Sequence, residues 1–344
     1  MNMRTLPAAL LAGLCLLLSA GTGLAAAPAD KVVVLVWEEF IAPSTLAALK
    51  KKGLVVEQIT FTSEEERLDL LKKQAGQIDL VVGDATTLAA FRRDRLIERI
   101  DFDRLGNARY LSTLLDSSTR YNLPYLWGHT GIAWRTDLVS KPLKDYKDLF
   151  ALARRNPGKV GLISGSHEAL MAARFAFGTA PYVLLSPKEV ADAEQALKPH
   201  LQNLVFVDSE LDEKAPLVTG EVLAAQAYNG DIAYLRDTYK VPLAFVIPQP
   251  GCMVWTESFM LVRNAPHPDA AYRFLNEINV PALAAANAEE VRYATSNSEA
   301  LEMVSAEFKG DAVIRPSLKG LSNCYFYREH DRATQTAMDK VKLD

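Results

Sequence analysis

The alternation of strands and helices near the start of the chain restricts the fold more than any other feature. Gly53 and Gly76 follow two helical stretches and suit left-handed helix ends, and Ser63 with Glu66 forms a capping-box pattern. The expected elements are strands over 31–36, 54–61 and 78–82 and helices over 44–52 and 63–74. This order favours right-handed βαβ units on a mostly parallel sheet, so we expect an α/β fold.

A second set of alternating elements occupies the middle of the chain. The segment from Pro248 to Gly251 carries two prolines and a glycine, which favours a crossover between lobes. The expected strands cover 159–163, 204–207, 222–228, 241–247 and 254–262, and the expected helices cover 169–177, 187–197 and 268–278. We therefore predict one lobe from 28–131 and 251–305, a second from 132–250 and 306–344, and a cleft between them.

The first 27 residues have the pattern of a secretory signal peptide. A start containing Arg4 precedes an apolar stretch over 6–24, and Ala25 to Ala27 follow as a cleavage site of small residues. We expect residues 1–27 to be removed and the mature chain to be exported. A membrane anchor is the competing interpretation, but this stretch contains several small and polar residues and ends without a charged stop.

The overall charge argues against nucleic acid as a partner. The chain has 38 Lys and Arg against 42 Asp and Glu, which gives a formal net charge of −4. Phosphate backbones are bound through clustered basic side chains, and the sequence has no basic patch interleaved with aromatic residues.

Two cysteines remain once the signal peptide, with Cys15, is removed. Cys252 and Cys324 form an even pair in a compartment that should be oxidising. A core of this size does not need a covalent staple, and buried free cysteines are common. The sequence therefore leaves a disulfide and two free thiols equally open.

Neither catalysis nor a cofactor is indicated. The five histidines are scattered without metal-ligand spacing, and no Gly-x-Ser-x-Gly elbow is present. The segment from Ser164 to Glu168 contains a serine, a histidine and an acid, but adjacent residues rarely face one another as a catalytic triad must. Gly158 and Gly161 do not form a phosphate-binding loop.

Aromatic rings and carboxylates occur together at three separate strand ends. The first strand ends at Trp37-Glu38-Glu39-Phe40, and the other two segments are Tyr228 to Asp231 and Trp255 to Glu257. Open α/β sheets bind ligands at the carboxyl ends of their strands. Ammonium groups are held by aromatic faces and by carboxylates, so the recurrence predicts a pocket for an organic amine.

Motifs along the whole mature chain carry a family resemblance. They are 37–43, 79–82, 123–132, 228–231, 247–251, 255–258, 271–276 and 293–295. With these segments the chain resembles the periplasmic spermidine/putrescine-binding proteins of bacterial ABC importers. The resemblance implies a two-lobed periplasmic binding protein of type II, the Venus-flytrap fold, with the ligand cleft between the lobes. It also implies a monomer that passes its amine to an ABC permease in the inner membrane.

The resemblance also implies a set of ligand contacts, some of them altered. Phe40 keeps the ring of a frequent tyrosine without its hydroxyl, Asp84 replaces a serine, Tyr228 replaces a tryptophan, and Glu257 replaces a shorter aspartate. The implied ligand-binding residues are Trp37, Glu38, Glu39, Phe40, Asp84, Glu168, Tyr228, Asp231, Trp255, Glu257 and Tyr293. Nothing is carried over to 322–327, so the length of the ligand stays open.

Two alternatives share the fold. The protein could report amine levels to a membrane-bound sensor instead of feeding an importer, and the sequence alone does not separate these roles. It could also bind a zwitterion, which would require a cation such as Arg135 near the cleft to meet the carboxylate.

Overall fold

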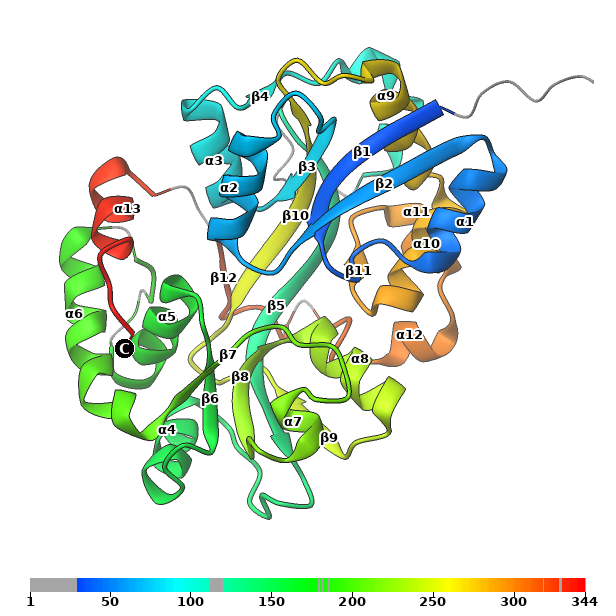
Figure 1. Ribbon diagram of the computed structural model, residues 1–344. Coiled ribbons are helices and arrows are strands. Elements are labelled where there is room, and N and C mark those ends of the chain that lie inside the picture. The colour runs from blue at the N-terminus through cyan, green and yellow to red at the C-terminus, as the bar shows by residue number, and fades with distance from the viewer. Residues whose placement is uncertain are drawn as a thin grey trace, which may run out of the picture.

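The computed structural model describes residues 30–111, 120–178, 180, 182–184, 186–317, 319–327 and 330–343 (Figure 1). The predicted signal peptide, 1–27, lies outside these residues. The first lobe is built on β1 (Asp30–Trp37), which pairs in parallel with β2 (Leu54–Phe61) and β3 (Leu80–Gly83). The next strand, β10 (Met253–Val262), runs antiparallel to β3 and completes the return of the chain to this sheet.

Local signals define the helices of the first lobe. Helix α1 (Pro43–Lys51) starts with proline, and the Ser63 hydroxyl caps α2 (Glu64–Lys73) by accepting from the Glu66 amide. Gly53, after α1, has a φ of 77°, as the left-handed helix end requires. The same prediction for Gly76 is wrong, because its φ is not positive and the last turn of α2 ends at Gln74 without such a residue.

The second lobe has its own parallel core. Strand β6 (Val160–Ile163) lies between β7 (Val205–Val207) and β8 (Ala224–Tyr228), parallel to both. The helices around this sheet are α4 (Tyr146–Arg155), α5 (Ser166–Phe177), α6 (Pro187–Leu197), α7 (Pro216–Thr219) and α8 (Asn229–Tyr239).

One long strand, β5 (Leu123–Arg135), runs through both lobes. Its first half pairs with β10, and its second half pairs with β8 and with β9 (Leu243–Val246). The strand order is therefore continuous, β2-β1-β3-β10-β5-β8-β6-β7. At Gly131, where the pairing changes lobe, an added Cβ would lie 2.3 Å from the Phe245 ring, so glycine is required for the close approach of β9.

Separate apolar cores support the two lobes. One includes Val34 and Phe259 and another includes Phe150 and Leu162.

The remaining described elements are β4 (Ile97–Glu98), α9 (Pro268–Ile278), α10 (Pro281–Val291), β11 (Ala294–Thr295), α11 (Ser298–Met303), α12 (Ala306–Gly310), β12 (Tyr325–Phe326) and α13 (Arg332–Met338), with short 3₁₀ turns at Phe102–Arg104, Gly106–Tyr110 and Lys198–Asn203.

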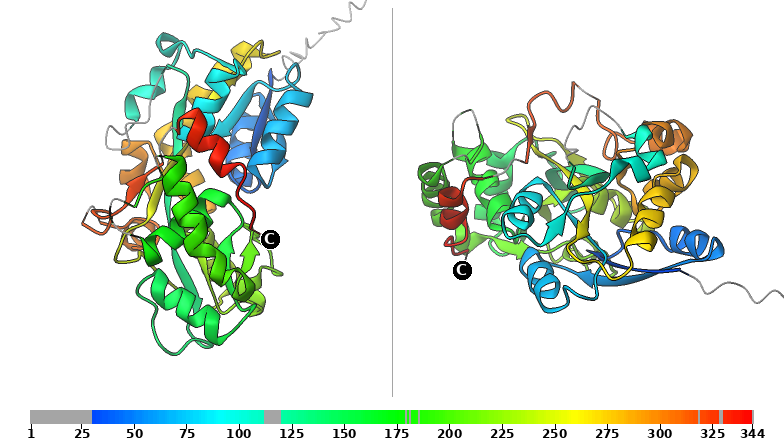
Figure 2. Two further views of the ribbon diagram at one scale, coloured as in Figure 1. Left: turned by 90° about the vertical axis from the view of Figure 1, so that its left-hand side faces the viewer. Right: turned by 90° about the horizontal axis from the view of Figure 1, so that it is seen from above.

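The C-terminal helices α12 and α13 pack against different elements. Helix α12 shares a core with α10, α11 and Ala233 of α8, whereas α13 packs beside α6 on the second lobe (Figure 2). The residue-level lobe boundaries, 28–131 with 251–305 and 132–250 with 306–344, remain a prediction. Among the described residues, no helix is long and apolar enough to cross a membrane.

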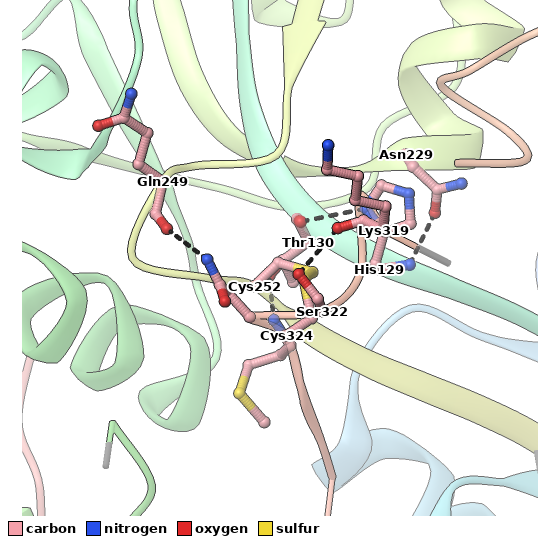
Figure 3. The surroundings of a disulfide bond; sticks show 10 residues. His129, Thr130, Asn229, Gln249, Cys252, Lys319, Ser322 and Cys324 are labelled. Atoms are coloured by element: carbon pink, nitrogen blue, oxygen red, sulfur yellow. Dashed lines mark hydrogen bonds between the residues drawn. A yellow bond between two sulfur atoms is a disulfide. The ribbon is translucent and has the colours of Figure 1, made fainter. Parts of the chain in front are cut away.

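The structure contains the Cys252–Cys324 disulfide (Figure 3). It joins the residue before β10 to the residue before β12, across 72 positions of sequence. Of the two alternatives that the sequence leaves open, the bonded one is present. Cys252 is fully buried, whereas Cys324 is partly exposed.

Candidate ligand-binding site

The tip of β1 and the middle of β10 meet through an indole and a carboxyl group. Trp37 Nε1 donates a 3.2 Å hydrogen bond to Glu257 Oε1. Glu257 is only 7% exposed, and its other oxygen, Oε2, has no hydrogen-bond partner. A buried carboxyl oxygen without a partner is costly, so this position favours a donor group brought by a ligand.

Burial also changes the charge state of Glu257. Desolvation raises its pKa to about 8, the nearby Asp84 carboxylate adds to the rise, and the Arg67 guanidinium opposes it. At neutral pH and without a ligand, the protonated form is therefore favoured. An ammonium group placed against Glu257 would reverse this preference, because an opposite charge stabilises the ionised carboxylate.

Arg67 is a buried cation that the sequence analysis did not select. It comes from α2, is 1% exposed, donates to the Val82 carbonyl at 3.2 Å and forms an ion pair with Glu64. Its guanidinium carbon lies 5.5 Å from the centre of the Trp37 ring and 5.2 Å from that of Phe61. Arg67 thus supports Trp37 by a cation–π contact while supplying positive charge near Glu257.

Four predicted aromatic residues form one continuous wall. Trp255 lies at its centre, 5.0 Å between ring centroids from Tyr293, 6.1 Å from Tyr228 and 6.4 Å from Phe40. Phe40 also lies 5.8 Å from Tyr293. The Trp255 indole nitrogen is buried without a hydrogen-bond partner. Such a wall can pack against the methylene groups of an aliphatic amine and offer ring faces to its charge.

Glu168, in the first turn of α5, provides the acid of the second lobe. Its Oε1 accepts from the Tyr228 hydroxyl at 3.3 Å and from the Tyr327 hydroxyl, and His167 Nδ1 lies 3.8 Å away. Burial alone would raise the pKa of Glu168, but His167 and the Tyr327 hydrogen bond outweigh it and lower the pKa below its ordinary value. Glu168 is therefore an ionised carboxylate ready to meet a cation.

Asp231 is held from the opposite lobe. The Tyr293 hydroxyl donates to Asp231 Oδ1 at 2.5 Å. Burial raises the pKa of Asp231, while the hydrogen bonds from Tyr293 and Ser209 act against the rise. Gly230 permits this contact, because an added Cβ would lie only 2.3 Å from the Tyr293 ring.

Other predicted contacts are placed differently. Glu38 and Glu39 are exposed, and Glu39 has a φ of 57°. Asp84 caps α3 (Ala85–Arg93), where its Oδ1 accepts from the Thr87 amide at 2.9 Å, so it acts on the site through its charge near Glu257. The ligand contacts of these three acids stay predictions.

The hypothesis that Arg135 serves as a cleft cation is wrong. Its guanidinium is engaged by Asp137 at 2.7 Å and by the carbonyls of Leu217 and Val218, all within the second lobe. The buried cation of the site is Arg67. Sequence reasoning also missed Tyr327 and His167, which both contact Glu168.

A cavity of about 40 Å³ lies behind the site, where Tyr228 and Asp231 meet Ser209 and Gln226. Ligand pockets typically measure roughly 300–1,000 Å³, so this space suits a water molecule better than an organic ligand. Within the described ranges, no group of three or more His, Cys, Asp or Glu could hold a metal ion.

The family model described as bacterial extracellular solute-binding protein matches residues 48–315. The chain belongs to this family. It is 28% identical over 321 residues to the spermidine/putrescine-binding periplasmic protein of Escherichia coli, covering 89% of this chain and 91% of that protein. It is also 28% identical over 294 residues to the norspermidine sensor of Vibrio cholerae, covering 84% and 81%.

The fold has solved counterparts. The spermidine/putrescine ABC transporter substrate-binding protein of Streptococcus pneumoniae superimposes with a TM-score of 0.76 at 20% identity, covering 91% of this chain and 97% of that one. The predicted two-lobed periplasmic binding protein fold is confirmed, as is membership of a solute-binding family.

Proposed function

We propose that this chain is a periplasmic solute-binding protein that captures a polyamine, a putrescine- or spermidine-like cation, and delivers it to an ABC permease. The observation that carries the proposal is that both lobes contribute buried acids that are hydrogen-bonded to aromatic side chains. Glu257 belongs to the first lobe, Glu168 and Asp231 belong to the second, and Trp255 lies at the centre of the wall.

The charge of the site supports an organic cation as ligand. Two carboxyl groups separated by ring faces match two ammonium groups separated by methylenes, because each charge meets an acid while the chain contacts the rings. Glu257 Oε2 lacks a partner before the ligand arrives. An anion would place negative charge beside Glu168, whose low pKa keeps it ionised.

Delivery requires export and a partner. The proposal therefore includes removal of residues 1–27, a periplasmic location and action as a monomer without a cofactor or a catalytic step. The names of the relatives support this setting, because those from E. coli and Salmonella typhimurium are periplasmic spermidine/putrescine-binding proteins.

Calorimetry tests the proposal. The chain from residue 28 onward, unfolded and refolded to remove bound ligand, is titrated with putrescine, cadaverine, spermidine, spermine, agmatine and γ-aminobutyrate. One-to-one saturable binding of at least one polyamine is expected, with glutamate as the negative control. Binding of glutamate and of none of the amines would overturn the cation assignment.

Sensing is a second candidate, because one relative is named as a norspermidine sensor. The two roles predict different partners for the ligand-bound form. Stimulation of the ATPase activity of an ABC importer in proteoliposomes supports delivery, whereas ligand-dependent binding to the periplasmic domain of a membrane signalling protein supports sensing.

A further inference from the structure

The segment 319–327, which we call the strap, is fastened to the start of β10. The Cys252–Cys324 disulfide joins them covalently, and β12 pairs in parallel with β10. The Tyr325 amide donates to the Cys252 carbonyl at 2.8 Å, and the Tyr327 amide donates to the Val254 carbonyl at 3.0 Å. The pairing covers only two residues of β12, too few to hold a strand by hydrogen bonds alone.

A second fastening lies on the other side of the disulfide (Figure 3). Asn323 Nδ2 donates to the Gln249 carbonyl at 3.3 Å. Gly251 has a φ of 135°, and a Cβ at this position would lie 2.1 Å from the Asn323 carbonyl oxygen. The absence of a side chain at Gly251 therefore allows the strap to lie directly against the crossover between the lobes.

The strap ends at the ligand site. Tyr327, three residues after Cys324, donates its hydroxyl to Glu168 Oε1, and its ring centre lies 4.7 Å from that of His167. The same carboxylate oxygen accepts from Tyr228 on β8. Glu168 is thus oriented by one hydroxyl from its own lobe and by one that the strap delivers.

We propose that the Cys252–Cys324 disulfide belongs to the ligand-binding apparatus, because it fixes the strap so that Tyr327 acts as a positioning residue for the Glu168 carboxylate. The inference rests on the proposed function in taking Glu168 as the contact for an amine. If the disulfide had a purely structural role, its removal would lower the stability of the protein and leave the ligand affinity unchanged.

A double-mutant cycle with putrescine and spermidine separates these roles. Tyr327→Phe should weaken binding about tenfold, because a hydrogen bond to an ionised group is lost. The Cys252→Ala/Cys324→Ala variant should lose at least fivefold, since the strap is released. In the Tyr327→Phe background, removing the disulfide should still lower the melting temperature but change the dissociation constant less than twofold. Fully additive losses, or wild-type affinity in Tyr327→Phe, would overturn the proposal.

Two further arms keep the test decisive. If the cysteine variant does not fold, the folded protein is reduced with dithiothreitol, which supplies two electrons, yields two thiols and ends as its own cyclic disulfide.

The pKa of Glu168, followed by carboxyl ¹³C NMR without ligand, should rise equally in Tyr327→Phe and in the disulfide-free protein. If the pKa of Glu168 rises in both variants but the protein binds no amine, only the proposed function is refuted. If the pKa of Glu168 is unchanged in the variants, the positioning role of Tyr327 is refuted.

Discussion

The Tyr293 hydroxyl lies 2.5 Å from Asp231 Oδ1, and this hydrogen bond links a residue beside β11 in the first lobe to the first turn of α8 in the second. The contact satisfies a buried carboxyl group whose pKa is raised by burial. Under the proposed function, a ligand ammonium approaches the same carboxyl group, so closure of the lobes and recognition of the cation share one acid.

Asp231→Asn should weaken an amine ligand at least tenfold, because the shape of the side chain is kept while its charge is lost. Calorimetry with the tightest amine of the panel measures the change. Glu65→Gln, on the exposed surface of α2, is the matched control and should bind as wild type does. Equal affinities in both variants would remove Asp231 from the site.

Binding should release a proton from Glu257. Because its pKa is about 8, an ammonium bound below this pH must displace the proton, so affinity should rise by up to about tenfold per pH unit between pH 6 and 8 and level off above. Burial is the main cause of this raised pKa; Asp84 adds to the rise, and Arg67 and the Trp37 hydrogen bond oppose it. Titrations in buffers of different ionisation enthalpy measure the released proton. Glu257→Gln should release none, and an unchanged pH profile in that variant would contradict the assignment.

Glu257 should also make the folding stability of the ligand-free protein depend on pH. Between the unfolded pKa of 4.5 and the folded pKa of about 8, the unfolded chain is ionised at Glu257 while the folded one stays protonated. Folding stability should therefore fall as pH rises through this window, by a few kcal/mol at most. Glu257→Gln should reduce the fall, as urea unfolding at pH 5 and pH 8 can establish.

Arg67→Met should destabilise the fold by about 3–5 kcal/mol, because it leaves the Val82 carbonyl and neighbouring acids without their buried partner. Urea unfolding measures the loss. Glu64→Gln is the control, since Glu64 is 63% exposed and an exposed partner contributes about 0–1 kcal/mol. A smaller loss in Arg67→Met than in the control would show that Arg67 has no structural role.

Elements with strong local signals are predicted well from the sequence. The strand over 54–61 and the helices over 187–197 and 268–278 are confirmed to the residue. Both helices begin with a proline, and Ser186 also caps the first of them. The long strand β5 was not predicted. It contains Pro124, Gly128 and Gly131, which argue locally against a strand, and pairing on both sides outweighs these propensities.

The site is only partly predictable for a similar reason. Trp37 and Phe40 lie in one recognisable motif and Trp255 and Glu257 in another, and the structure joins them through the Trp37–Glu257 hydrogen bond and the Phe40–Trp255 ring contact. Arg67 lies in a charged helix whose sequence suggests exposure, and its burial depends on rings from distant segments. Tyr327 contacts Glu168 from a segment that a disulfide across 72 positions and two backbone hydrogen bonds join to β10, and no local pattern encodes this placement.

A last prediction separates lobe closure from charge. Gly230→Ala leaves every acid in place, but its Cβ would lie 2.3 Å from the Tyr293 ring, so α8 and Tyr293 must move apart. The variant should bind its amine at least tenfold more weakly and should fail to become more compact in small-angle scattering when the ligand is added. Gly76→Ala is the matched control, because nothing lies within 4 Å of its added Cβ. If Gly230→Ala compacts and binds the amine as Gly76→Ala does, ligand binding does not depend on the contact between Tyr293 and α8. The lobes would then bind the ligand without closing at this contact.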